Sequence, residues 1–180
     1  MKKTTYILAI ALLLTIIVPS FVAQAQPYGK GIYNANVPYG TQTALSISTN
    51  GNVSIPITPV SSGALATGTS TVTVTSTDVV GYKLYVRALT NTNLNNLGAL
   101  LPASANGAPA PLATNTWGYN TDATANFVGM ELADTLIRTL NAPASTGDVT
   151  TLTYGIRVDL AKPAGKYINT VIYTAVPSTD

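Results

Sequence analysis

The chain has 180 residues, with nine lysines and arginines, seven aspartates and glutamates, no histidine and no cysteine. These absences exclude Ser-His-Asp and Cys-His catalytic arrangements, disulfide bonds, and metal sites with His or Cys ligands. Charged residues make up only 9% of the chain, against roughly 25% in an average soluble domain, so Thr, Ser and Asn must supply most of the polar surface.

The first 25 residues have the pattern of a secretory signal peptide. Lys2 and Lys3 form a basic start, Ile7 to Val18 form an apolar stretch, and Ala23-Gln24-Ala25 is a small-x-small cleavage site. We therefore expect a secreted, extracellular protein of the cell surface whose mature chain starts at Gln26. The alternative is an uncleaved membrane anchor, but the apolar stretch is well short of the roughly 20 residues that cross a bilayer.

The predicted mature chain has no net charge, because Lys2 and Lys3 leave with the signal peptide and seven basic and seven acidic residues remain. Nothing in this balance indicates a nucleic-acid partner or an anionic membrane surface, so the only membrane contact expected is the signal segment itself if it stays uncleaved. A neutral polar surface suits self-association or packing on a wall polymer, and it is equally the composition of many exported proteins.

Residues 26–41 are predicted to form an extended N-terminal arm. The sequence PYGKGIYNANVPYG is rich in Gly, Pro, Tyr and Asn and has few apolar anchors. Its apolar side chains have no core of their own, so they need a partner, either this domain or the next subunit. The residues expected to make that contact are Tyr28, Ile32, Tyr33, Val37 and Tyr39.

From Thr43 the apolar residues alternate with Thr and Ser, which predicts strands with one buried face. Asn50-Gly51 predicts a short hairpin turn between the first two strands, and Pro56 and Pro59 place the second strand at a sheet edge or a bulge. A loop at 61–70 and a strand at 71–76 follow. The alternating residues are Leu45 and Ile47, then Val53, Ile55 and Ile57, then Val72 and Val74.

Residues 81–89, GYKLYVRAL, are the clearest predicted strand, with Tyr82, Leu84, Val86 and Ala88 on the buried face. A long Asn-, Ala- and Pro-rich connection at 91–114 contains an apolar knot at 97–101. Residues 115–119 predict a short strand. Residues 131–140 space three leucines four apart and fit either a short helix or a strand.

Residues 151–160 alternate again, and after a turn at 161–165 a last strand is predicted at 166–176. About seven short strands with Gly and Pro turns favour an all-β fold, an immunoglobulin-like antiparallel β-sandwich. We expect one such domain, at residues 42–180, after the signal peptide (1–25) and the arm (26–41).

Two aromatic features stand out. Trp117, beside Tyr119, could stack on a sugar ring if exposed, or fill the space between two sheets if buried; the second reading is favoured for a lone Trp. Gly165 and Tyr167 flank the start of the last strand, where a Tyr of an immunoglobulin-type corner bonds back to the preceding loop and locks the turn.

The remaining polar candidates are weak. Asp122, Glu131 and Asp134 follow no glycosidase pattern, and Asn120-Thr121-Asp122 is read as a turn rather than a calcium site, so we predict no enzyme activity, no metal and no cofactor. Lys83 and Asn169 could form an isopeptide crosslink with Glu131 as the acid. Asn52-Val53-Ser54 is the only glycosylation sequon.

The order of the segments ALSISTNGNVSIPITP, STVTVTSTDVVGYKLYVRA, NTWGY and TYGIRVDLAKPAGKYINTVIYTAV resembles small secreted β-sandwich proteins of bacterial cell surfaces, of the WxL-like and pilin-like kind. The resemblance implies an exported structural subunit of a surface layer or filament, self-associating as a homopolymer, and suggests assembly by N-terminal strand addition. The alternative is a module that binds cell-wall or host glycans, or an adhesin, using Trp117 and Tyr119.

Overall fold

The computed structural model describes residues 44–77 and 79–178, so the predicted signal peptide and N-terminal arm lie outside the described residues. Within these ranges the regular structure consists of strands alone, as expected for an all-β fold. The nine strands are β1 (Ala44–Thr49), β2 (Ala64–Thr77), β3 (Gly81–Ala88), β4 (Leu94–Asn96), β5 (Ala99–Leu101), β6 (Thr116–Asn120), β7 (Thr135–Leu140), β8 (Asp148–Val158) and β9 (Val171–Ser178).

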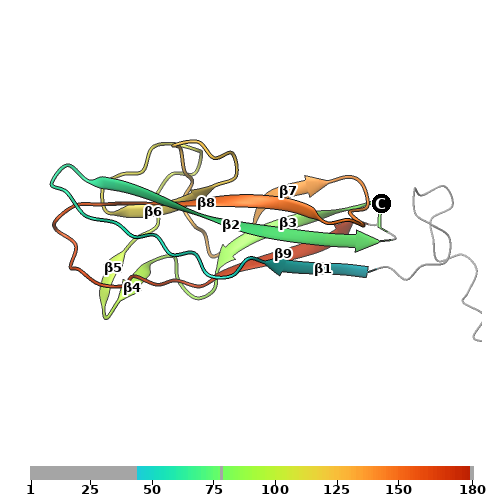
Figure 1. The fold of residues 1–180 in the computed structure, drawn as a ribbon, viewed down its shortest axis with the longest axis horizontal. Helices are drawn as coiled ribbons and strands as arrows, with labels where there is room; N and C mark the ends of the chain where they lie inside the picture. Colours follow the sequence, from blue (N-terminus) through green and yellow to red (C-terminus); the bar gives the residue numbers. More distant parts are fainter. Residues whose placement is uncertain (1–43, 78, 179–180) are drawn as a thin grey trace, which may run out of the picture.

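The strands form two main antiparallel sheets around one core. The larger sheet has the order β1-β2-β8-β6 and the smaller one β7-β3-β9, while β4 and β5 form a separate hairpin. Side chains from both main sheets, among them Val72, Leu84 and Leu152, belong to a single buried cluster. The arrangement is elongated, and β1 and β9 lie along the same side of it (Figure 1). This architecture is consistent with a β-sandwich.

β3 has the predicted alternation. Tyr82, Leu84, Val86 and Ala88 are buried, and Lys83 between them is exposed. β2 is longer than predicted, since it begins at Ala64 and not at residue 71. The Ala, Gly and Thr residues that resemble a loop in the sequence pair with the far half of β8, in a register that runs from Ala64 opposite Val158 to Val74 opposite Asp148.

The predicted hairpin at Asn50-Gly51 and the predicted strand at 53–57 are wrong. β1 instead pairs with the second half of β2, and the Asn50 side chain accepts hydrogen bonds from the Ser70 hydroxyl (3.1 Å) and the Thr71 amide (3.0 Å). Beyond Asn50 the chain leaves the sheet while its side chains keep alternating between partly buried and exposed positions. Period two marks an extended backbone, and here that backbone joins no ladder, in a segment that also carries Pro56 and Pro59.

The helical alternative for residues 131–140 is also wrong, because residues 135–140 form β7 along the edge of β3. β-Branched residues at 135, 137 and 139 suit a strand once a partner edge is available. The last strand starts later than predicted, at Val171, and the chain before it is held through a bridge between Ile168 and Asn95 of β4. β4 and β5 occupy part of the connection predicted at 91–114.

Candidate functional site: a groove between two unpaired segments

A groove of about 910 Å³ opens beside the larger sheet, in the half of the molecule where the smaller sheet has ended. Residues 51–57, after β1, form one wall, and residues 165–171, before β9, form the other. In Figure 1 the first wall is the teal segment that follows the arrowhead of β1, and the second is the red segment that leads into the start of β9. Trp117, Tyr154 and Ile156 lie between the walls as a floor.

The first wall is held by side chains alone. Val53, Ile55 and Ile57 pack against the core, while Asn52 and Ser54 are exposed. Among the described residues, the backbone N–H and C=O groups of 51–59 take part in no hydrogen bond to another part of the protein. This wall is therefore an extended segment whose backbone is open to a partner.

The second wall is paired on one side. The N–H and C=O of Ile168 both bond to Asn95, at 3.0 and 2.9 Å, and the Thr170 carbonyl accepts the Leu89 amide at 2.9 Å. In extended backbone, neighbouring residues direct their peptide groups to opposite sides. Tyr167 and Asn169 therefore direct theirs toward the groove, and no hydrogen bond within the described chain uses them.

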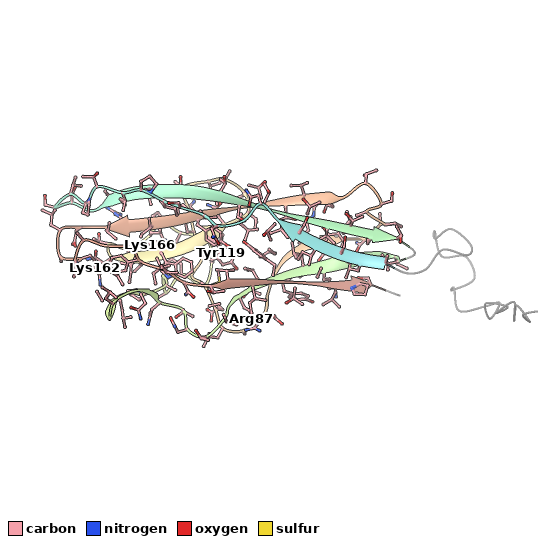
Figure 2. All side chains as sticks on the ribbon, turned by 60° about the horizontal axis from the view of Figure 1, so that its bottom comes forward. Arg87, Tyr119, Lys162 and Lys166 are labelled. Carbon is pink, nitrogen blue, oxygen red and sulfur yellow. The ribbon has the colours of Figure 1, made fainter. Side chains whose placement is uncertain are left out.

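The corner at Gly165 and Tyr167 fixes the outer end of this wall. The Tyr167 hydroxyl donates to the Pro163 carbonyl at 3.0 Å, which is the bond back to the preceding loop expected from the sequence. Gly165 has a φ of +149°, and a side chain there would collide with Asn96 of β4. Figure 2 shows Lys166 next to this corner and Lys162 beyond it; the Lys162 ammonium bonds to the Leu100 carbonyl at 2.8 Å.

The floor is aromatic and buried. Trp117 is 4% exposed, its indole N–H donates to the Thr92 carbonyl at 2.9 Å, and its ring centroid lies 6.4 Å from that of Tyr154. Burial, followed by the neighbouring Tyr173 hydroxyl with which it shares a hydrogen bond, raises the pKa of Tyr154 far above its usual value. Trp117 thus packs in the core, as favoured, with one part of its side chain reaching the groove.

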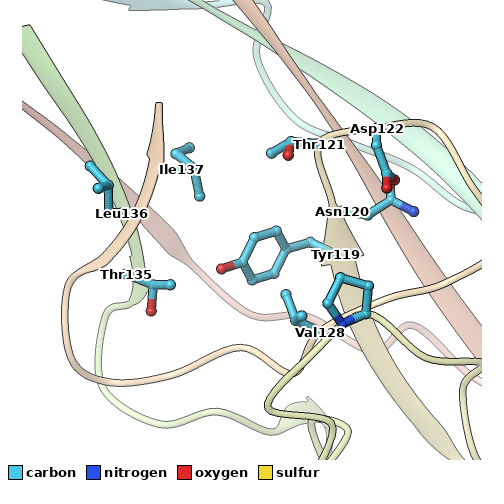
Figure 3. A pocket seen from close by; sticks show the side chains of 9 residues that line it. Tyr119, Asn120, Thr121, Asp122, Val128, Thr135, Leu136 and Ile137 are labelled. Atoms are coloured by element: carbon cyan, nitrogen blue, oxygen red, sulfur yellow. The ribbon is translucent and has the colours of Figure 1, made fainter. Parts of the chain in front are cut away.

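Tyr119 does not share this site. It is 3% exposed and lines a separate pocket of about 230 Å³ with Thr135 and Ile137 of β7 (Figure 3). Burial raises the pKa of its hydroxyl. The two rings predicted as a joint stacking platform therefore face different cavities, and neither presents an open face.

Asn120, the last residue of β6, and Asp122 hold the turn that follows this strand. The Asn120 amide donates to the carbonyls of Thr124 (2.9 Å) and Asn126 (2.8 Å), and an Asp122 oxygen accepts from the Thr124 amide and hydroxyl. The described residues contain no group of three or more acidic side chains that could hold a metal ion. No helix long and apolar enough to cross a membrane occurs in the described part of the chain.

The Lys83 and Asn169 crosslink does not fit the register. Lys83 lies opposite Val176 in β9, seven residues along the chain from Asn169, which corresponds to about 23 Å in a strand. The Asn169 amide bonds instead to the Asn91 carbonyl at 2.9 Å, across the base of the second wall. Asn52 of the sequon is exposed at the groove rim.

A partly exposed ion pair lies away from the groove, where β7 leads into β8. Asp148 accepts the Tyr82 hydroxyl at 2.6 Å and two guanidinium nitrogens of Arg138 at 2.9 and 3.1 Å. Burial opposes the charged carboxylate, but these hydrogen bonds and the Arg138 charge together hold the pKa of Asp148 below its usual value. Burial and the bond to Asp148 raise the pKa of Tyr82 to about 12, so the phenol stays a donor at neutral pH.

This pair predicts acid sensitivity. Because the folded pKa of Asp148 is depressed, its stabilisation is present above the ordinary value of 3.8 and is lost as pH falls through the folded value. We expect Asp148→Asn to lower the free energy of unfolding by about 1–2 kcal/mol at pH 7, because the buried Tyr82 hydroxyl loses a charged acceptor while water screens the pair with the exposed Arg138. Urea titrations at pH 7 and at pH 3 should show the gap between variant and wild type shrinking in acid; a gap that stays constant would contradict the assignment.

Comparison of the chain with protein-family models, with curated proteins and with solved structures finds no match. The function therefore has to be argued from the groove itself. The sequence did not reveal its walls, since residues 51–59 resemble a paired strand and residues 166–170 resemble part of the last one. Pro56 and Pro59 could have indicated the first wall, because prolines inside an alternating segment argue against a paired strand.

Proposed function

We propose that the protein is an exported structural subunit of a surface layer or filament, built on an immunoglobulin-like sandwich of the pilin-like kind and assembling with copies of itself by strand addition. The single observation that carries this proposal is the groove between two extended segments with unused backbone groups. An open pair of edges is a template for another strand, and proteins that keep one exposed use it for pairing.

The low charge of the chain favours association with other copies and gives little support to a soluble monomer. The predicted mature chain has equal numbers of acidic and basic residues, and among the residues that the structure describes only one charged side chain, that of Lys166, lines the groove. Without net charge, copies repel each other weakly, so contacts between backbone edges and neutral polar faces suffice to hold them.

A second candidate function uses the same groove. Its volume falls within the range of small-ligand sites, and Asn52, Lys166 and Asn169 offer polar groups near the edge of Trp117. A glycan-binding module would use these groups. It leaves the unpaired backbone of the walls unexplained, so strand addition is preferred.

Deletion of residues 26–41 tests the proposal. We expect the chain from Gln26 to form polymers as its concentration rises, seen by negative-stain microscopy and light scattering, because the arm links one copy to the next. The deleted protein should keep the β-sheet circular dichroism of the parent and remain monomeric. The proposal is wrong if the complete mature chain stays monomeric, or if the deleted protein polymerises equally well. A glycan-dependent change in Trp117 fluorescence without polymers would favour the second candidate.

A further inference from the structure

The groove has backbone without hydrogen bonds on both walls and a buried floor between them. Its lining includes seven consecutive residues of each wall, or roughly 23 Å of extended chain, and the backbone groups of 51–57, Tyr167 and Asn169 make no hydrogen bond within the described chain. A strand placed there would pair with residues 51–57 on one side and with Tyr167 and Asn169 on the other. Side chains on one of its faces would point down onto Trp117, Tyr154 and Ile156, which are buried residues of the lining.

The sequence of the arm has the pattern such a strand needs. In residues 33–37, YNANV, the odd positions are Tyr33, Ala35 and Val37 and the even positions are Asn34 and Asn36, while Ile32 before them is an apolar residue at an even position. This alternation gives one apolar face and one polar face. Pro38 has no N–H and ends the pairing on that side. No charged residue falls within this stretch, which suits a groove whose described lining has one charged residue, Lys166.

We propose that the groove is the acceptor site for residues 31–37 of a second copy of this chain, inserted as a strand with Tyr33, Ala35 and Val37 facing the floor. This inference rests on the proposed function and identifies both the site and the segment that occupies it. The backbone of the two walls supplies the hydrogen bonds, and the floor selects the apolar face of the arm.

The fold favours a second copy over the chain's own arm. β1 begins at Ala44, at the end of the molecule away from the groove, and runs toward it (Figure 1). Residues 38–43 would have to reverse at Ala44 and run back along the whole of β1. From residue 37 to Ala44 the fully extended chain covers at most about 25 Å, and the six-residue β1 takes up about 20 Å of that, which leaves about 5 Å for both the reversal and the step into the groove. An arm from another copy has no such limit.

Matched charge variants in the full mature chain test which face of the arm is directed at the floor of the groove. Val37→Asp places a carboxylate on the face directed at the buried floor, whereas Asn36→Asp places the same charge on the polar face one residue away. We expect Val37→Asp to raise the concentration needed for polymerisation about tenfold or more, because an unpaired charge is costly to bury. Asn36→Asp should polymerise like the parent. Equal behaviour of the two variants would overturn the proposal.

Crosslinking tests the site. The natural chain has no cysteine, so every disulfide must come from engineered positions. Mature chains carrying Asn36→Cys are mixed with chains carrying Ser54→Cys or Thr170→Cys, the outward positions of the two walls, and oxidised. We expect mixed dimers with both partners. Ser145→Cys, an exposed residue in the turn before β8, is the control and should give none. Crosslinks to residue 145 as strong as those to residues 54 and 170 would place the arm elsewhere.

A peptide separates this proposal from the proposed function. The peptide GIYNANVPYG is added to the full chain carrying Val37→Asp, and the emission of Trp117 is followed. We expect a saturable change, absent with the same peptide carrying aspartate in place of its valine. If the peptide binds but the parent chain does not polymerise, the groove is an acceptor site and the proposed filament is wrong. If the parent chain polymerises but the peptide does not bind, the filament proposal stands and the groove is not the acceptor site.

Discussion

Leu84→Ala is expected to lower the free energy of unfolding by about 2–5 kcal/mol, the range for removing a large buried aliphatic side chain. Leu84 is in the middle of β3, is 0% exposed, and belongs to the cluster shared by both main sheets. Its strand pairs with β7 and with β9, so neither neighbour can move inward to fill the space without breaking a ladder. Urea unfolding of parent and variant measures the difference.

Leu136→Ala is the matched control for this substitution. Leu136 is on β7, directly beside β3, and is 50% exposed. Truncation there should change stability by only about 0.5 kcal/mol or less, the usual range for a surface site. If the two alanine variants unfolded at the same urea concentration, the assigned core would be wrong.

Gly118→Ala is expected to destabilise the protein by about 3 kcal/mol or more, above the usual cost of overpacking, because the obstacle is backbone. A methyl group at this position in β6 would overlap the Val128 carbonyl oxygen and approach the Cβ of Phe127 at 3.3 Å. The neighbouring Tyr119 is tied to Val128 through both backbone groups, at 3.0 and 2.9 Å, so this segment cannot yield without losing those bonds.

Gly107→Ala provides the comparison for Gly118. An added methyl group at Gly107 meets nothing within 4 Å. We expect thermal unfolding of this variant to match that of the parent, while Gly118→Ala melts well below it or fails to accumulate as folded protein. Similar melting of the two variants would show that β6 and residue 128 are not in contact.

The sequence predicted the fold class because alternation reports burial directly. β3 illustrates this, since each residue from Tyr82 to Ala88 that was assigned to the buried face is buried. The same signal misled at residues 53–57, where side chains alternate but the backbone pairs with nothing. Period two reports an extended chain with two faces, and it contains no information on whether a neighbouring strand exists.

The groove was hidden for a related reason. Trp117 was correctly favoured as a core residue, but its place between two open walls depends on contacts between segments more than 100 residues apart, at 51–57 and 165–171. The corner at Tyr167 was easier, because Gly165 and the following Tyr are local signals for a turn closed by one hydrogen bond. The turn could be predicted from neighbouring residues in the sequence, whereas the lack of a paired strand on the groove side of each wall depends on how distant segments pack.

The long ladder between β2 and β8 has a mechanical consequence. These strands pair over eleven consecutive positions, from Ala64 opposite Val158 to Val74 opposite Asp148, along the long axis of the molecule. Tension applied at Ala44 and resisted at the far tip acts parallel to the strands, so it loads these hydrogen bonds together in shear and does not peel them one at a time. In the proposed filament, tension along the axis would therefore fall on a ladder that resists in shear.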